Sequence, residues 1–266
     1  MSHLKRNGYA TSADLHSVEL CEILSRMENF QLEFLAATAT IWSPTFAFTG
    51  DALYQWSRQW EYPYAYANID VSHGRVLDAG SGFTFFPFFL AQRGFQVVCC
   101  DTMAILDEPF RQAQQNTQLP IKFERASITH LTQPDNSFDV VCCVSVLEHM
   151  PPAERRRALL EFARILHPGG RLITTCDISL GRDTDIQIED FASLLGDLCA
   201  IFEPVYPLEM RRPPDLLTTE YFQDVASWRL PWRPQRANLR NLLRRRAGHT
   251  EFHALAVVGL TFAKPR

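Results

Sequence analysis

The residues best suited to chemistry in this sequence are a glycine turn and an acid that follows it. Gly80, Ser81 and Gly82 interrupt an apolar run, and Asp101 ends the next apolar run. Glycine lets backbone N–H groups approach a ligand without interference from a Cβ atom. An acid roughly 20 residues after such a turn is typical of a carboxylate that binds ribose hydroxyls. The spacing therefore predicts a nucleotide site.

The glycine pattern does not match a dinucleotide site. A dinucleotide fingerprint has a third glycine, which allows close helix–strand packing beside the pyrophosphate. Phe85 stands at that position here. A ligand without a pyrophosphate would not need this glycine, and S-adenosylmethionine, which is adenosine joined to a methionine tail, is such a ligand. The pattern therefore favours S-adenosylmethionine over NAD.

Two more candidates for chemistry follow later apolar runs. His149 comes shortly after the run Ser137–Ser145, and Asp177 ends the run Arg171–Asp177. Open α/β sheets bind their ligands at the carboxyl ends of strands. The imidazole of histidine titrates near neutral pH, which suits a general base. The alternative is that His149 holds its loop by a hydrogen bond. Asp177 is predicted either to orient an acceptor or to cap the following loop.

These residues require a sheet that brings them together. Helical patterns alternate with short apolar runs, which predicts an α/β fold with a largely parallel sheet and helices on both faces. A helix is expected from Phe85 to Arg93, with Thr84 as its cap, and another is expected to close at Pro168–Gly170. The predicted strands begin near Arg75 and lie at Val76–Leu77, Val97–Cys100, Ile121–Ile128, Ser137–Ser145, Arg171–Asp177, Ala200–Pro207 and His253–Lys264.

Residues 1–70 are expected to form a helical and aromatic cap on a core of residues 71–266. Thr11–Asp14 supplies residues that start helices. The apolar residues that follow at near-helical spacing are Leu15, Val18, Ile23, Leu24, Met27, Phe34 and Leu35.

The composition is that of an ordinary globular protein. Charged residues make up 21% of the chain, and its net charge of -4 indicates no particular partner. The seven cysteines contain no CxxC pair, and five of them lie in apolar runs, which predicts buried thiols. We find no secretion signal and no apolar stretch of transmembrane length, so a cytoplasmic protein is expected. The five cysteines are Cys99, Cys100, Cys142, Cys143 and Cys176.

Several motifs occur in the order found in one enzyme family. "VLDAGSG", "LTQPDNSFD", "FDVVCCVSVLEHM" and "PPAERRRALLEFARILHPGGRLITT" lie between Gly74 and Asp177. Together they resemble class I S-adenosylmethionine-dependent methyltransferases, in particular their small-molecule (type 11-like) branch. The resemblance implies a Rossmann-like, seven-stranded and mostly parallel sheet with an antiparallel last strand. It also implies methyl transfer from S-adenosylmethionine to an O or N atom of a small-molecule acceptor.

The resemblance also implies a set of cofactor contacts. One departure is Ser127, since relatives often have an aspartate there; a serine hydroxyl binds the adenine amine more weakly. The implied contacts are Asp78, Gly80, Ser81, Gly82, Phe83 and Tyr64 for the methionine tail and its surroundings, Asp101 for the ribose, Thr102, Met103, Ser127 and Ile128 for the adenine, and Val144 and Ser145 beside the sulfonium.

Some relatives bind a divalent metal through an ExxEH motif. Ser145 replaces the first glutamate here and leaves Glu148 and His149. Two adjacent residues do not complete a metal site, so no metal is expected.

Two segments have open interpretations. The aromatic segment Tyr54–Asp70 is either a lid over the cofactor tail or a packing helix; its polar members are Arg58, Glu61, Tyr62, Tyr64 and Tyr66. The segment at about 207–250 is predicted to be a substrate-side insertion. Its basic run, Arg229–Arg246, is interpreted first as a solvated helix face, with an anion pocket or a nucleic-acid groove as alternatives.

The predicted partner is thus a small-molecule acceptor. Binding to nucleic acid or to a membrane is not expected, and the protein is expected to be a monomer or a homodimer. Two other functions stay open. One is a non-catalytic cofactor-binding partner protein. The other is an RNA methyltransferase, against which we find no accessory RNA-binding module.

Overall fold

The computed structural model describes residues 2–43, 46–48, 50, 52–54, 57–180, 188–219 and 255–266. The basic run and most of the predicted insertion lie outside these residues, as does His253. The strands are β1 (Asn7–Tyr9), β2 (Gly74–Ala79), β3 (Phe95–Asp101), β4 (Ile121–Arg125), β5 (Phe138–Val144), β6 (Leu166–Ser179), β7 (Glu203–Pro204), β8 (Leu208–Glu209) and β9 (Leu255–Ala263). The α-helices are α1 (Val18–Ala37), α2 (Arg58–Ala67), α3 (Phe86–Gln92), α4 (Asp107–Thr117), α5 (Pro152–Ile165) and α6 (Ile188–Ile201).

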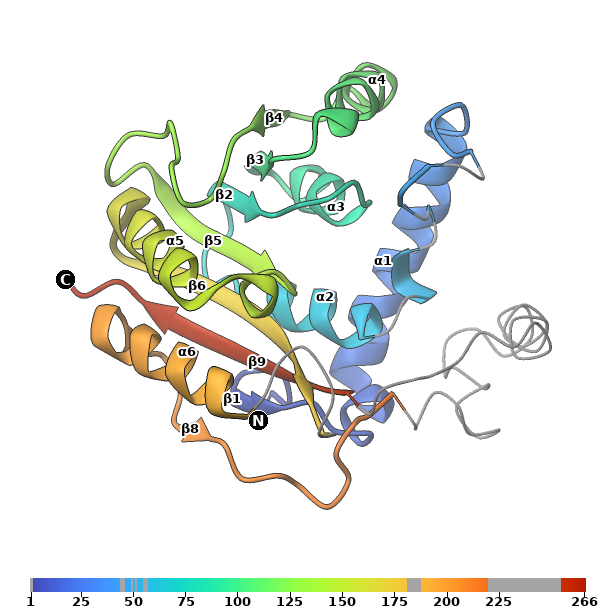
Figure 1. The fold of residues 1–266 in the computed structure, drawn as a ribbon. Coiled ribbons are helices and arrows are strands. Elements are labelled where there is room, and N and C mark those ends of the chain that lie inside the picture. Colours follow the sequence, from blue (N-terminus) through green and yellow to red (C-terminus); the bar gives the residue numbers. More distant parts are fainter. Residues whose placement is uncertain are drawn as a thin grey trace.

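One sheet forms the centre of the molecule, with the strand order β4-β3-β2-β5-β6-β9-β1-β8 (Figure 1). Strands β4, β3, β2, β5 and β6 are mutually parallel, and β9 runs antiparallel to β6. This confirms the predicted Rossmann-like α/β fold with an antiparallel last strand.

The predicted count of seven strands is wrong, because the sheet of the described residues has nine. Beyond β9 the sheet continues in short strands: β7 and β1 both pair with β9, and β8 pairs with β1. The side chain of Asn7 connects β1 to β9 and to the segment between β7 and β8. Its Nδ2 donates to the carbonyl of Tyr206 (2.7 Å), and its Oδ1 accepts from the N–H of Thr261 (2.6 Å). The N-terminal segment thus contributes a strand to the sheet as well as helices.

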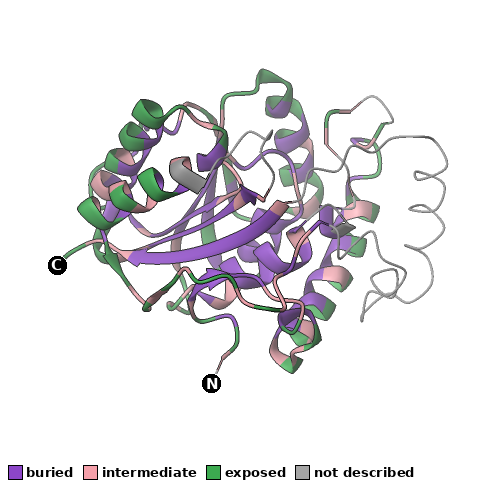
Figure 2. Cartoon of the chain, turned by 60° about the horizontal axis from the view of Figure 1, so that its bottom comes forward, coloured by how far each residue is buried: buried purple, intermediate pink, exposed green. Residues whose placement is uncertain are grey.

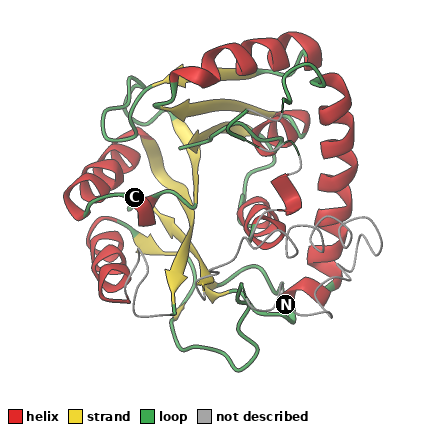
Figure 3. Ribbon diagram, turned by 45° about the vertical axis from the view of Figure 1, so that its right-hand side comes forward, coloured by secondary structure: helices red, strands yellow, loops and turns green. Residues whose placement is uncertain are grey.

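Helices cover both faces of the sheet (Figure 3). Successive strand residues point to opposite faces. Val76 therefore belongs to the hydrophobic cluster that contains residues of α1, α2, α3 and α4, whereas Leu77 belongs to the cluster that contains residues of α5 and α6. The pairs Cys99–Cys100 and Cys142–Cys143 divide in the same way. Figure 2 shows the central strands as buried. All seven cysteines are free thiols, and the prediction that the five in apolar runs are buried is confirmed.

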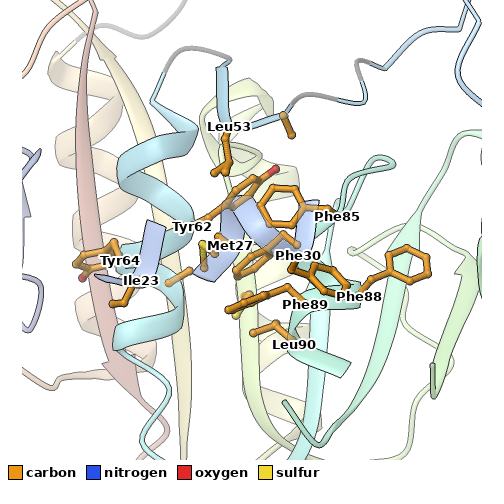
Figure 4. Close-up of a cluster of buried hydrophobic side chains, with 14 of the residues drawn as sticks. Ile23, Met27, Phe30, Leu53, Tyr62, Tyr64, Phe85, Phe88, Phe89 and Leu90 are labelled. Carbon is orange, nitrogen blue, oxygen red and sulfur yellow. The ribbon is translucent and has the colours of Figure 1, made fainter. Parts of the chain in front are cut away.

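An aromatic cluster fills the space between α1 and α3. Met27 and Phe30 of α1 lie among Tyr62 of α2, Phe89 of α3 and Phe85, the residue that precedes α3 (Figure 4). The rings of Phe30 and Phe89 meet edge to face with their centroids 5.8 Å apart. This packing explains the run of phenylalanines after the glycine turn, which forms core rather than ligand contacts.

Helix α2 packs flat on the sheet through two stacked rings, those of Trp60 and Tyr64, whose centroids are 4.8 Å apart. A Cβ at Gly259 of β9 would lie 2.5 Å from Cζ of Tyr64 and 2.7 Å from Cη2 of Trp60, so glycine is required there. The packing-helix interpretation of the aromatic segment therefore holds for this face of α2.

Two predicted helix boundaries and one predicted apolar residue differ in the structure. Helix α1 begins at Val18 behind the cap Ser17, while the residues Asp14–His16, near the predicted start, form a 3-10 turn (η1). Val18 is 75% exposed and does not belong to the apolar face. The predicted helix end at Pro168–Gly170 lies inside β6, at a register shift between β6 and β5.

Within the described ranges, none of the helices has the length and apolar character of a membrane span.

Candidate functional site

A cavity of about 570 Å³ opens at the carboxyl ends of the parallel strands. Parallel strands end at one edge of the sheet, so the segments after β2, β3, β4 and β5 meet there. The lining residues are Phe48, Arg58, Tyr62, Asp78, Gly80, Ser81, Gly82, Thr84, Asp101, Thr102, Met103, Ala126, Ser127, Ile128, Val144, Ser145, Val146, His149, Met150 and Glu154.

The glycine turn after β2 forms the floor of the cavity. Gly80 and Gly82 have φ angles of 71° and 52°, which favour glycine. A Cβ at Gly80 would lie 2.6 Å from Cγ2 of Val146, and one at Gly82 would lie 2.6 Å from Cε1 of Phe48. The turn therefore needs both glycines for its conformation and for space.

Asp101 ends β3 and holds the turn. Its Oδ2 accepts from the N–H of Gly82 and its Oδ1 from the N–H of Met103, each at 3.0 Å. A carboxylate has about four acceptor positions, so each oxygen keeps one for a ligand. Two adjacent hydroxyl donors, such as those of a ribose, match this arrangement.

Asp78 is the penultimate residue of β2, just before the glycine turn, and is almost fully buried. Burial, together with the nearby charge of Asp101, raises the pKa of Asp78 to about 7, while the Arg58 guanidinium opposes the shift. A cationic ligand group beside Asp78 would favour its ionised form.

Ser127 follows β4 and lines the cavity together with Ile128. The hydroxyl of Ser127 lies 2.8 Å from that of Thr129 and accepts the N–H of Thr129 at 3.3 Å. The serine that replaces the usual aspartate is thus part of a local turn and offers the cavity an uncharged group.

At the other end of the cavity, α2 meets the end of β5. Ser145 is a non-glycine residue with a φ of 51°, an uncommon conformation that surrounding contacts must hold. Its N–H donates to the carbonyl of Thr175 (3.1 Å), its hydroxyl donates to Glu61 (2.6 Å), and the same hydroxyl accepts from Nη1 of Arg58 (2.8 Å).

His149 lies on the short 3-10 helix η4 (Leu147–His149) and lines the cavity with an exposed side chain. Its imidazole has no hydrogen-bond partner within the described residues, so no hydrogen bond of the ring holds the loop there. Its neighbour Glu148 is buried, and Oε1 of Glu148 accepts from the N–H of Asp177 at 3.0 Å. Burial raises the pKa of Glu148 to about 8.

The cavity contains most of the predicted site residues but not Phe83, Tyr64 or Asp177. Phe83 points into the aromatic core, with its ring centroid 5.2 Å from that of Trp42. The hydroxyl of Tyr64 donates to the carbonyl of Arg6 at 2.8 Å, away from the cavity. The structure therefore does not support these three residues as members of the site.

Other lining residues were not among the predicted site residues. Arg58 and Tyr62 were named only as polar members of a possible lid; they lie four positions apart on one face of α2, a spacing that a helical projection detects. Phe48 carries no such signal. Those that were not predicted as site residues are Phe48, Arg58, Tyr62, Thr84, Ala126, Val146, Met150 and Glu154.

The cavity fits the predicted cofactor in its donor and acceptor groups. Side chains at Gly80 and Gly82 would fill the floor of the cavity, so the two glycines leave this space to a ligand. The Asp101 carboxylate has two acceptor positions left, which suit two hydroxyl groups such as those of a ribose. For a metal, no group of three or more His, Cys, Asp or Glu residues is suitably placed in the described part of the chain. The expected absence of a metal stays a prediction.

Comparison with known proteins agrees with this geometry. Residues 77–174 match a family model described as a methyltransferase domain. The ubiquinone biosynthesis O-methyltransferase of Xanthomonas oryzae pv. oryzae (strain PXO99A) is 33% identical over 111 residues, which are 41% of this chain and 45% of that protein. The demethylmenaquinone methyltransferase of Deinococcus radiodurans is 35% identical over 118 residues, 44% of this chain and 48% of that protein. The chain thus aligns with about half the length of these curated relatives.

Two solved structures share the fold. The cyclase SpnF superposes with a TM-score of 0.55 at 18% identity, and the superposition covers 98% of this chain and 99% of the SpnF chain. The geranyl diphosphate C-methyltransferase from Streptomyces coelicolor A3(2) superposes with a TM-score of 0.53 at 11% identity, and the superposition covers 76% of this chain and 74% of that enzyme's chain. These likenesses show the Rossmann-like fold that the chain shares with both proteins. Residues 77–174 of this chain are thus similar to a methyltransferase domain.

Proposed function

We propose that this protein transfers the methyl group of S-adenosylmethionine to an O or N atom of a small molecule. The observation that carries the proposal is the cavity that unites the glycine turn, Asp101 and the end of β5 with His149. The first two can hold the nucleoside of the cofactor, and the others lie where the resemblance places the sulfonium. The cofactor supplies an electrophilic methyl group, so the protein has to align the acceptor and exclude water.

Alignment is the main contribution that these residues can make. Holding two reactants in a reactive geometry can lower a barrier by about 7–11 kcal/mol at best. Phe48, Tyr62 and Met150 supply apolar surface in the cavity wall, and Asp101 and Ser127 supply polar contacts toward the nucleoside. Apolar surface combined with polar groups that fix the orientation of a ligand is typical of a site for small molecules.

His149 is proposed as the general base for a hydroxyl acceptor. It lines the cavity, and its imidazole makes no hydrogen bond to other described residues that would occupy it. Asp177, the second candidate from the sequence, does not line the cavity and is not proposed as the base.

Substitution of His149 tests this role. His149→Ala should lower turnover by about 10²–10⁴ with little change in cofactor affinity. His149→Gln keeps hydrogen bonding but cannot accept the proton at neutral pH. If glutamine restores most of the lost rate, His149 positions the acceptor instead, and if neither variant is slower, the assignment is wrong.

The acceptor itself is proposed from the relatives. The curated relatives are named for O-methylation in ubiquinone biosynthesis and for methylation of demethylmenaquinone. A screen with methyl-labelled S-adenosylmethionine should therefore begin with hydroxylated aromatic and quinone-type compounds and continue to amines. Label in a small-molecule product would support the proposal.

Three other outcomes would overturn it. Tight cofactor binding without labelled product from any acceptor would favour a non-catalytic partner protein. A rearranged product without label would favour a cyclase, an activity that the fold also carries, since SpnF is named as one. Label in RNA, together with retention on RNA at physiological salt, would favour an RNA methyltransferase.

A further inference from the structure

A buried carboxylate lies beside the cavity, and the proposed transfer gives it no role. Glu61 of α2 is fully buried, although glutamate is rarely buried without partners. It accepts hydrogen bonds from four side chains on three different segments. These are the hydroxyls of Ser57, Ser145 and Thr175 and the Nη1 group of Arg58.

The network ends at the cavity in Arg58. The two N–H donors of its Nη1 go to Glu61 and to the hydroxyl of Ser145. Nε and Nη2 of Arg58 have no hydrogen-bond partner within the described part of the chain, and the side chain lines the cavity with 22% of its surface exposed. A guanidinium has five donors, so three of those of Arg58 remain for a ligand.

The charges around Arg58 fit a ligand group that carries both signs. Burial alone would lower the pKa of Arg58, but the adjacent Glu61 raises it above its ordinary value, so the guanidinium stays charged. Asp78 lines the same cavity and is close enough to interact electrostatically with Arg58. A cation and an acid thus lie together beside the glycine turn, matching a carboxylate and an ammonium on one carbon atom.

We infer that Glu61 is a positioning residue that fixes Arg58 as a carboxylate subsite, and that this subsite holds the carboxylate at the amino-acid end of the bound cofactor. The inference rests on the proposed function for the identity of the ligand. It adds a contact that the motifs after the strands do not supply, because Arg58 and Glu61 precede the first core strand in the sequence.

The role of Glu61 follows from the flexibility of arginine. An arginine side chain loses considerable conformational entropy when it is held in one place, and a ligand that must first order it binds less tightly. Glu61 and Ser145 hold Nη1 of Arg58 in the absence of ligand. The guanidinium fork is therefore oriented before a carboxylate arrives, and paired contacts between such a fork and a carboxylate are strong.

The first test compares two ligands on one variant. S-adenosylhomocysteine carries the amino-acid end, whereas 5′-methylthioadenosine keeps the nucleoside and lacks that end. Arg58→Gln should weaken binding of S-adenosylhomocysteine by about 10- to 100-fold in calorimetry and leave methylthioadenosine within about twofold. Equal losses for both ligands, or no loss for either, would overturn the inference.

The second test asks whether Glu61 acts through Arg58. Glu61→Gln should weaken S-adenosylhomocysteine and spare methylthioadenosine, and the double variant with Arg58→Gln should bind no more weakly than Arg58→Gln alone. Additive losses in the double variant would show that Glu61 acts by another route and would overturn its positioning role.

Asp14→Asn is the matched control for a buried ion pair. Asp14 is also buried, and it accepts from Arg6 and from Nε1 of Trp60, which lies on the same helix as Glu61. This control should lose stability and keep its preference for S-adenosylhomocysteine over methylthioadenosine. A control that loses this preference would assign the effect to disturbance of α2. If Glu61→Gln does not fold, Arg58→Gln still decides whether the subsite exists.

The proposed function and this inference can fail separately. A protein that shows the predicted ligand pattern but transfers no methyl group would disprove the function alone. A protein that transfers methyl groups without the pattern would disprove the subsite alone.

Discussion

Removal of the Asp101 carboxylate is the sharpest test of the cofactor site. Each of its oxygens accepts one backbone N–H, from Gly82 or Met103, and keeps one acceptor position toward the cavity. Two hydrogen bonds from ligand hydroxyls to a charged acceptor are worth about 1.5–3 kcal/mol each, or about 3–6 kcal/mol together. Asp101→Ala should therefore weaken S-adenosylhomocysteine by about two to four orders of magnitude.

The structure also predicts how the variant Asp101→Asn would behave. The asparagine side chain would have one carbonyl oxygen to accept hydrogen bonds, and its amide would face a backbone N–H donor. The loss of affinity should thus lie between zero and that of Asp101→Ala. Because the charge of Asp101 raises the pKa of Asp78, both substitutions should also lower the pKa of Asp78.

Calorimetry with S-adenosylhomocysteine measures the effect, and thermal melting of each variant without ligand checks that it folds. Asp107→Asn removes the same charge at the start of α4, outside the cavity, and should bind like the unchanged protein. Unchanged affinity in a folded Asp101→Ala variant would refute the ribose assignment. Tighter binding of NAD than of S-adenosylhomocysteine would refute the choice of nucleotide.

Two further predictions concern pH and metal. The folded-state pKa of Glu148, about 8, lies above its unfolded value of 4.5. Its contribution to stability is therefore fully present below about pH 4.5 and is lost as pH rises toward 8, by about 1.4 kcal/mol per pH unit at most. In urea unfolding at pH 5 to 8, Glu148→Gln should therefore gain stability relative to the unchanged protein as pH rises; a constant difference would contradict this. Chelators should leave methyl transfer intact, because Ser145 stands where metal-binding relatives have a glutamate; complete loss with EDTA that a divalent ion restores would disprove it.

The cofactor half of the cavity was predictable because its residues lie at the ends of strands. A short apolar run followed by glycine or an acid marks where a strand ends, and parallel pairing places such ends at one edge. Gly80, Asp101, Ser127 and Ser145 meet in this way. Their local sequence was sufficient because the topology supplies their proximity.

Phe83 shows where this reasoning ends. It directly follows Gly82, and the sequence does not show to which side a chain with positive φ turns its next side chain. In the structure that side chain enters the core and contacts Phe34, Trp42 and Phe110. The aromatic surface of α1 and of the segment after it provides this alternative, and those residues lie far away in the sequence.

Tyr64 illustrates the same limit on a helix. Arg58 and Tyr62 share one face of α2, while Trp60 and Tyr64 share another. The helical period separates these two sets from sequence alone. Gly259 of β9 decides which of the two pairs faces the cavity. Because Gly259 has no side chain, Trp60 and Tyr64 can lie flat on the sheet. The choice between the two faces therefore rests on a residue almost 200 positions later.

Glu61 combines a signal that the sequence contains with one that it lacks. A glutamate among tryptophan, tyrosine and proline residues indicates a carboxylate that burial will require to be paired. Its partner Arg58 is within one helical turn and could be predicted. The hydroxyls of Ser145 and Thr175 lie 84 and 114 residues away, and only the folded sheet brings them to the same carboxylate. The residues around the glycine turn could thus be predicted from local motifs, whereas the network that holds Arg58 is assembled from distant segments.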